Sequence, residues 1–193
     1  MEKTNKNQVR KEIKDLMNQF CTNRDYRELS EKSVYHHVIT SEAYQRSSAV
    51  FGYMALPDEL DPISILNDAL RMGKKVALPR VNGDTMDFYW VDSLDQKQLE
   101  KGSFSIQEPK EGAAPVDVSG LAEQVLVLVP GRAFSMDGKR LGRGKGFYDK
   151  WFRGLEDAGV KTRVNKWGVC YPCQIVADLP TQVHDIIMDK VVF

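Results

Sequence analysis

Apolar residues recur at helical spacing in several parts of the chain. Near the N-terminus one helical face is marked by five apolar positions: Val9, Ile13, Leu16, Met17 and Phe20. A weaker pattern of the same period predicts a second helix over residues 25–45. Further helices are predicted from Ile63 to Arg71, ended by Gly73, and from Phe147 to Ala158, ended by Gly159.

Short apolar runs rich in β-branched and aromatic residues predict the strands. These runs are Ser47–Ala55, Lys75–Val81, Met86–Val91, Val125–Val129, Trp167–Tyr171 and Met188–Phe193. Asn82-Gly83-Asp84 is a turn signal, so the second and third runs are expected to pair as a hairpin. Residues 101–120 contain several Gly and Pro and read mostly as loop. From residue 47 onward, predicted strands and helices follow one another along the chain.

The run Val125–Val129 (VLVLV) contains no polar residue and does not alternate. Such a strand is typical of a parallel sheet covered on both faces. Alternation of strands and helices around it predicts an α/β fold, a single three-layer Rossmann-like domain over residues 1–193 with a largely parallel central sheet flanked by helices. The length of 193 residues suits one domain.

Charge is balanced overall, with 27 Lys and Arg against 27 Asp and Glu. A net charge of zero gives no field that would attract a polyanion, so neither a nucleic-acid nor a membrane partner is expected. Three cysteines, no apolar signal core and no long apolar run indicate a cytoplasmic protein. We expect a monomer or weak homodimer. The balance conceals local excesses: residues 132–153 carry seven cations, and residues 51–70 carry four acids and no cation.

The basic excess centres on a glycine-rich segment, KRLGRGKGFYDK, at residues 139–150. Gly142, Gly144 and Gly146 alternate with cations and stand between a predicted strand and a predicted helix. Free backbone N–H groups at such a helix start favour a phosphate. The segment matches neither a Walker A loop nor a dinucleotide fingerprint. A flexible basic surface loop is the alternative interpretation.

The same segment resembles a known family. Residues 140–149, RLGRGKGFYD, are similar to the RLGRGKGYYD of the 5-formyltetrahydrofolate cyclo-ligases, also called methenyltetrahydrofolate synthetases. The preceding VLVPGRAFSMDG resembles the strand and Pro-Gly turn of that family, where PGLAFD is usual, so Arg132 and Ser135 are departures. Weaker matches, from Lys6 to Asp189 and in the same order, extend the resemblance over nearly the whole chain.

The resemblance implies an enzyme that uses ATP and Mg²⁺ to convert 5-formyltetrahydrofolate to 5,10-methenyltetrahydrofolate. In that reaction the formamide oxygen attacks the terminal phosphate, the nitrogen at position 10 closes the ring, and phosphate leaves. No protein nucleophile is needed, so catalysis should come from positioning and charge stabilisation. Small molecules are the expected partners.

The resemblance also implies site residues. Arg143, Lys145 and Tyr148 are expected to be catalytic. The residues expected to bind ATP are Lys6, Arg10, Arg140, Leu141, Gly142, Arg143, Gly144, Lys145, Gly146, Phe147 and Tyr148. Those expected to bind folate are Met54, Glu59, Phe104, Arg143 and Phe147. Asp149, and less strongly Asp185, are expected to bind the metal, since hard oxygen ligands suit Mg²⁺.

Each of these residues also has a structural interpretation. Lys6 and Arg10 could form a solvated helix face, Glu59 could be an exposed loop charge, and Phe104 could belong to the core. Asp149 could simply stabilise the first turn of a helix. Two other functions stay open from the residues alone: a sugar-phosphate isomerase or kinase on a related scaffold, and a non-catalytic folate-binding regulator.

Overall fold

Six strands form the central sheet of the computed structural model, which describes residues 5–193 except 21, 103–104, 122, 161–162 and 184. The strand order is β10-β9-β6-β1-β2-β3. The strands are β1 (Ala49–Phe51), β2 (Lys75–Asn82), β3 (Thr85–Val91), β6 (Val125–Val129), β9 (Val164–Val169) and β10 (Lys190–Val192). All neighbours pair in parallel except β2 and β3, which form an antiparallel hairpin. The predicted largely parallel sheet is confirmed.

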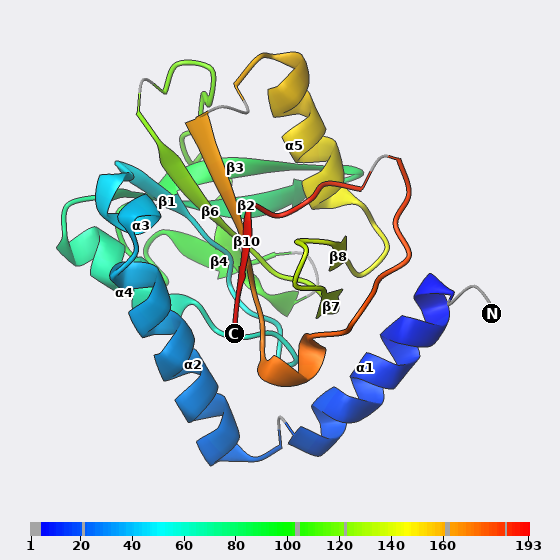
Figure 1. Cartoon of the computed structure of the whole chain (residues 1–193). Coiled ribbons are helices and arrows are strands. Elements are labelled where there is room, and N and C mark those ends of the chain that lie inside the picture. Colours follow the sequence, from blue (N-terminus) through cyan, green and yellow to red (C-terminus); the bar gives the residue numbers. More distant parts are fainter. Residues whose placement is uncertain (1–4, 21, 103–104, 122, 161–162, 184) are drawn as a thin grey trace.

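Alternate side chains of β6 face two different cores. Leu126 and Leu128 join the core that α1 (Lys6–Phe20), α2 (Arg24–Ile39), α3 (Glu42–Arg46) and α4 (Ile63–Arg71) help to build. Val125, Val127 and Val129 face the opposite core, to which α5 (Phe147–Asp157) contributes Phe152 and Leu155. All five β6 residues are buried, as expected for a central strand. Figure 1 shows these helices around the sheet.

Two elements differ from the expected boundaries near the N-terminal half of the sheet. The helix predicted over residues 25–45 is two helices, because Ser41 caps α3 by accepting a hydrogen bond from the Tyr44 amide at 3.1 Å. The strand predicted over Ser47–Ala55 pairs only at Ala49–Phe51. A β-carbon at the next residue, Gly52, would lie 2.5 Å from Leu66 of α4. The chain there runs directly against a helix.

The strand predicted at Trp167–Tyr171 begins and ends earlier, as β9. Register with β6, which pairs Val125 with Val164, sets its start. A short 3₁₀ helix, η3 (Pro172–Gln174), follows Tyr171 and ends the extended chain. Proline at the first position of this helix cannot donate a ladder hydrogen bond.

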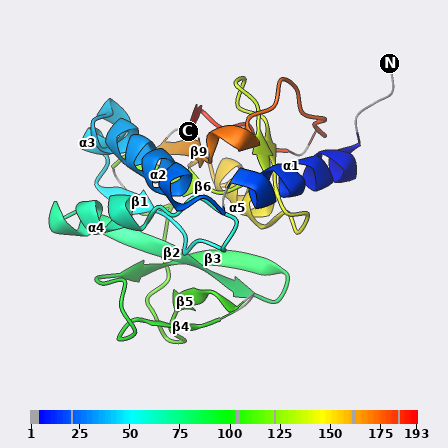
Figure 2. The same cartoon turned by 90° about the horizontal axis from the view of Figure 1, so that it is seen from below.

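Two small hairpins occur in segments expected to be loop or glycine-rich connection. β4 (Leu99–Lys101) pairs with β5 (Gln107–Pro109), and Figure 2 shows this hairpin beyond β2 and β3, away from α1 and α2. β7 (Ala133–Phe134) pairs with β8 (Arg140–Leu141). In the second hairpin, Arg140 and Leu141 at the start of the glycine-rich segment are buried.

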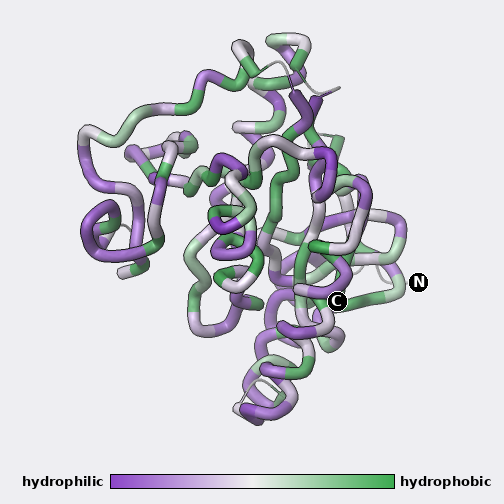
Figure 3. The backbone as a smooth tube through the Cα atoms, turned by 90° about the vertical axis from the view of Figure 1, so that its left-hand side faces the viewer, coloured by the Kyte–Doolittle hydropathy of each residue, from purple (hydrophilic) through white to green (hydrophobic). Residues whose placement is uncertain are grey.

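Hydropathy follows this layering. In Figure 3 hydrophobic segments run through the middle of the molecule, whereas the helices alternate between hydrophobic and hydrophilic residues. Within the described part of the chain, no helix combines the length and apolar character needed to cross a membrane.

Candidate active site

A cavity of about 550 Å³ lies past the end of β6. Pro130 and Gly131, which directly follow β6, form part of its wall. The rest comes from α1, Glu59, the glycine-rich segment, the first half of α5 and residues 182 and 185. Figure 1 shows the β7–β8 hairpin between the start of α5 and the segment that leads to β10. Open α/β sheets bind ligands beyond the carboxyl ends of their strands.

Nearly all the residues expected at the site line this cavity. They are Lys6, Arg10, Glu59, Arg140, Leu141, Gly142, Arg143, Gly144, Lys145, Gly146, Phe147, Tyr148, Asp149 and Asp185. Met54 does not line it; its half-buried side chain packs against the core beneath α1–α4. Phe104 lies outside the described residues. Lys150, Arg153 and Gln182 also line the cavity, and the two cations belong to the basic stretch already noted.

Backbone conformation prepares the glycine-rich segment for an anion. Gly144 and Gly146 have φ of 109° and 69°, which side chains other than glycine seldom adopt. Gly146 is the N-cap of α5 and supplies no side-chain hydrogen bond to the helix amides. The amides of the first turn of α5 and the positive end of the helix dipole therefore suit a phosphate.

The first helix joins two other segments at the cavity. Lys6 Nζ lies 2.6 Å from Asp185 Oδ2, and Arg10 Nε donates to the Gly142 carbonyl at 3.1 Å. The Lys6 side chain is 22% exposed, so it is not a solvated surface charge. Lys6 and Arg10, four positions apart on α1, thus both face the cavity, and their binding to the nucleotide phosphates stays a prediction.

Arg140 belongs to β8 and is buried, although the sequence places it in an open loop. Its NH2 group lies 2.9 Å from Asp149 Oδ2, and NH1 donates to the Pro130 carbonyl at 3.2 Å. Its guanidinium carbon lies 5.5 Å from the centre of the Tyr148 ring. Among the described residues, buried Arg140 Nε and the Tyr148 hydroxyl are left without a hydrogen-bond partner. Buried polar atoms of this kind indicate a missing ligand or water.

Burial and the nearby Glu59 raise the pKa of Tyr148 well above its ordinary value. The phenol therefore stays protonated at neutral pH and can donate a hydrogen bond. It is not suited to act as a base.

Glu59 lines the same cavity from the loop that precedes α4 and is 6% exposed. Its Oε1 accepts from Arg143 Nε at 2.8 Å, and its Oε2 accepts from the Leu56 amide at 3.0 Å. Glu59 is thus a buried, oriented carboxylate and not an exposed loop charge.

Asp58 bridges two guanidinium groups, those of Arg143 and Arg132. Burial acts to raise the pKa of Asp58, but hydrogen bonds and charge from Arg143 and Arg132 outweigh it and lower the pKa. The pKa of Arg143 is raised, since attraction to Glu59 and Asp58 outweighs the opposing effect of burial. The acidic and basic regions seen in the sequence therefore meet here.

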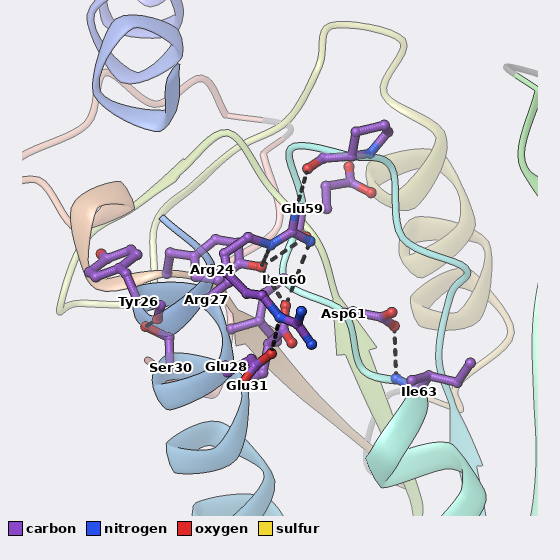
Figure 4. Close-up of polar contacts among 12 residues, drawn as sticks. Arg24, Tyr26, Arg27, Glu28, Ser30, Glu31, Glu59, Leu60, Asp61 and Ile63 are labelled. Carbon is purple, nitrogen blue, oxygen red and sulfur yellow. Dashed lines mark hydrogen bonds and ion pairs between the residues drawn. The ribbon is translucent and has the colours of Figure 1, made fainter. Parts of the chain in front are cut away.

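Hydrogen bonds from α2 hold the segment that carries Asp58 and Glu59 (the carboxylate segment), and they were not expected from the sequence. Arg27 donates to the Pro57 carbonyl at 3.2 Å and to the Tyr171 hydroxyl at 3.1 Å. The Tyr171 hydroxyl donates to Glu31 at 2.6 Å. Figure 4 shows Arg27 reaching from α2 toward the segment that carries Glu59. The ion pair of Arg27 with Glu31 follows the i, i+4 spacing of a helix, but its contacts with Pro57 and Tyr171 join distant parts of the chain and leave no local pattern.

Two carboxylates could contribute to a metal site. Asp149 and Asp185 line the same cavity, and the Ile186 amide donates to Asp149 Oδ1 at 3.3 Å. Within the described residues, no group of three or more His, Cys, Asp or Glu gathers to hold a metal by itself. One or two carboxylates completed by phosphate oxygens and water is the usual arrangement for Mg²⁺. The donor set fits a magnesium ion brought with a nucleotide.

Comparison with known proteins shows the family of this chain. Residues 2–193 match the description of the 5-formyltetrahydrofolate cyclo-ligase family. The chain belongs to this family. It is 30% identical over 160 residues to the mouse 5-formyltetrahydrofolate cyclo-ligase, covering 81% of this chain and 78% of the mouse protein. It is 27% identical to that of Haemophilus influenzae, covering 93% and 92% of the two chains.

A solved structure supports the fold. The NMR structure of Aquifex aeolicus 5,10-methenyltetrahydrofolate synthetase superposes with a TM-score of 0.77 at 28% identity, covering 97% of this chain and 88% of that one. The α/β fold and the ligase function expected from the resemblance are both confirmed. The reaction of the family is the ATP-dependent conversion of 5-formyltetrahydrofolate to 5,10-methenyltetrahydrofolate. The comparisons support neither the isomerase or kinase nor the non-catalytic regulator.

Proposed function

We propose that this cyclo-ligase carries out its reaction in the cavity past β6, with ATP on the glycine-rich side and the reduced folate on the Glu59 side. One observation carries the proposal: Arg143 stands between the two sides and pairs with Glu59 from within the glycine-rich segment. A residue placed there can contact both substrates. The formamide oxygen and the terminal phosphate must meet at the same point.

The nucleotide phosphates would lie against the start of α5. The first-turn amides donate there, and Lys6, Arg10, Arg140, Arg143 and Lys145 supply positive charge. The three phosphates of ATP bring about four negative charges, so several converging cations suit them. Leu141, Phe147 and the three glycines complete the wall.

Catalysis would rest on charge stabilisation. As the formamide oxygen attacks, charge develops on the transferred phosphoryl oxygens and on the leaving ADP. Arg143 and Lys145 can neutralise it, and the Tyr148 hydroxyl can donate a hydrogen bond to it. Breaking the imidate C–O bond during ring closure then releases phosphate. These three side chains act without forming a covalent bond to the substrate.

Asp149 and Asp185 would hold Mg²⁺, which supplies further neutralisation of phosphate charge. Each carboxylate is paired with a cation in the structure, Asp149 with Arg140 and Asp185 with Lys6. These cations keep the carboxylates oriented toward the cavity before a nucleotide arrives.

The folate would place the N–H donors of its pterin ring against Glu59, with Phe147 covering a ring face. Phe147 lacks the hydroxyl that the family usually has at this position, so its contribution is apolar. Met54 would need to approach from the core against which it packs. Phe104 stays a predicted contact.

The wider expectations remain proposals. We expect one domain over residues 1–193, a cytoplasmic location, and a monomer or weak homodimer. Its partners would be small-molecule substrates and neither nucleic acid nor membrane.

A direct test mixes the protein with 5-formyltetrahydrofolate, Mg²⁺ and ATP, and follows the near-ultraviolet absorbance of the methenyl product. Product should form with ATP and not without it. Parallel mixtures lacking Mg²⁺, with chelator present, test the metal. Product formed equally without ATP would contradict the proposal.

A further inference from the structure

Arg132 is the feature of this site that the reaction described above does not use. It stands where the family usually has an apolar residue in its Pro-Gly turn segment, and it does not line the cavity. Its backbone is anchored on both sides: its amide donates to the Leu141 carbonyl at 2.7 Å, and its carbonyl accepts from Gln174 Nε2 at 3.1 Å. The side chain therefore leaves from a fixed point.

The side chain of Arg132 is 18% exposed and pairs with Asp58. The two oxygens of Asp58 are divided between cations, Oδ2 with Arg132 and Oδ1 with Arg143. Arg143 in turn pairs with Glu59. The four side chains form one chain of alternating charge, Arg132–Asp58–Arg143–Glu59, from outside the cavity to its folate side.

Arg143 needs such support because the residues on either side of it have no side chains to pack against it. It lies between Gly142 and Gly144, and its side chain is 31% exposed. Asp58 is 35% exposed, and a pair between two such groups alone contributes little order. Adding the better buried, backbone-anchored Arg132 fixes the Asp58 carboxylate in one orientation.

We propose that Arg132 is a positioning residue that, through Asp58, holds the guanidinium of Arg143 against Glu59. This inference rests on the proposed function, because it assumes that Glu59 and Arg143 meet the folate. It deepens that function by assigning substrate positioning to a residue outside the cavity.

Arg132→Leu should weaken folate binding roughly tenfold, a coupling of the size found within one ion-pair network. The KM for ATP should change less, since the first-turn amides of α5, Lys6 and Lys145 do not depend on Asp58. Arg132→Lys should restore binding only in part, because lysine keeps the charge but lacks the planar fork. A merely structural role would lower the melting temperature and leave the dissociation constant unchanged.

Arg80→Leu is the matched control. Arg80 is 20% exposed and pairs with Glu100, which is 40% exposed, so its burial resembles that of the Arg132–Asp58 pair. It lies on β2, outside the cavity. This variant should leave folate binding unchanged.

A double-mutant cycle with Asp58→Asn tests whether Arg132 acts through Asp58. If Arg132 acts through Asp58, Arg132→Leu should change folate binding less than twofold in the Asp58→Asn background. Full additivity of the two effects would overturn the inference, as would an Arg132→Leu variant that binds folate like the wild type. Calorimetric titration with 5-formyltetrahydrofolate alone measures these constants whether or not turnover occurs. Turnover of the wild type tests the proposed function separately. A wild-type protein that binds no folate would overturn both the proposed function and the role of Arg132.

Discussion

Arg140 NH2 lies 2.9 Å from Asp149 Oδ2, in a pair whose side chains are only 5% and 18% exposed. Arg140 comes from the β7–β8 hairpin and Asp149 from the first turn of α5. The pair therefore fixes the two ends of the glycine-rich segment relative to each other. The geometry of the proposed phosphate site and the local stability therefore depend on the same contact.

Asp149→Asn should reduce kcat about 100-fold or more, because the proposed magnesium ligand loses its charge. The free energy of unfolding should also fall by about 1–3 kcal/mol, since Arg140 keeps a hydrogen-bond acceptor but loses its counter-charge. Turnover against Mg²⁺ concentration and urea unfolding measure the two effects. Asp157→Asn, at the exposed end of the same helix, is the control. Unchanged magnesium-dependent turnover would reject the metal assignment.

Lys145→Ala should raise the KM for ATP about tenfold or more, because a charge facing the phosphates is lost. Lys145 is exposed, so the free energy of unfolding should change by less than about 0.5 kcal/mol. Initial rates at varied ATP and a melting curve test this. Lys14→Ala, an exposed residue of α1, should leave both unchanged. A Lys145→Ala enzyme with normal ATP dependence would show that Lys145 does not bind phosphate.

Tyr148→Phe separates ligand binding from stability. The hydroxyl is buried without a partner among the described residues, so removing it should leave stability unchanged or increase it by up to about 1 kcal/mol. Turnover should nevertheless fall about tenfold or more, because the substrate loses a hydrogen-bond donor. Thermal unfolding and kcat are measured on the same preparation. A loss of stability with full activity is the opposite result and would make Tyr148 structural.

Glu59→Gln should raise the KM for 5-formyltetrahydrofolate about tenfold, with a smaller change in the KM for ATP. The amide oxygen can still accept from the Leu56 amide, but the charge that faces Arg143 and the pterin is lost. Initial rates with each substrate varied in turn give the comparison. Equal increases in both KM values would argue for general disturbance of the cavity.

Asp68 provides a pH prediction away from the site. Its carboxylate is 7% exposed, accepts from the Tyr44 hydroxyl at 2.7 Å and pairs with Arg71. Burial acts to raise the pKa of Asp68, but these partners lower it below its ordinary value of 3.8. A lowered folded-state pKa gives stability that is present above the ordinary value and is lost as pH falls through the folded value.

The free energy of unfolding of Asp68→Asn should therefore lie about 1–3 kcal/mol below that of the wild type at neutral pH. The difference should shrink below about pH 4 as Asp68 becomes protonated. Urea unfolding from neutral to acidic pH measures it. A difference that is constant down to about pH 2 would show that the Asp68 charge contributes nothing.

Local sequence patterns predicted the elements that local physics controls. The α4 boundaries agree because Ile63–Arg71 carries its own apolar face and Gly73 ends it. The β2–β3 hairpin agrees because Asn82-Gly83-Asp84 favours a tight turn. The unusual backbone of the glycine-rich segment was also predictable, since φ above zero at Gly144 and Gly146 favours glycine.

Contacts between distant segments were not readable in this way. Arg143 and Glu59 are separated by 84 positions, and Arg27 and Tyr171 by 144. Met54 shows the converse, because a residue expected at the folate packs against the core and does not line the cavity. Strand order and helix docking determine such outcomes, and neither leaves a local periodicity.

The amino-acid sequence by itself thus determined the α/β class, the position of the parallel core strand and the glycine-rich connection to α5, because each depends on the preferences of neighbouring residues. Only the tertiary structure decided that Arg140 is buried against Asp149, that Arg27 supports the carboxylate segment, and that Asp58 lies between Arg132 and Arg143. A charge becomes part of a site when folding excludes water around it and brings its partner within a few ångströms, and packing of the whole chain sets both conditions.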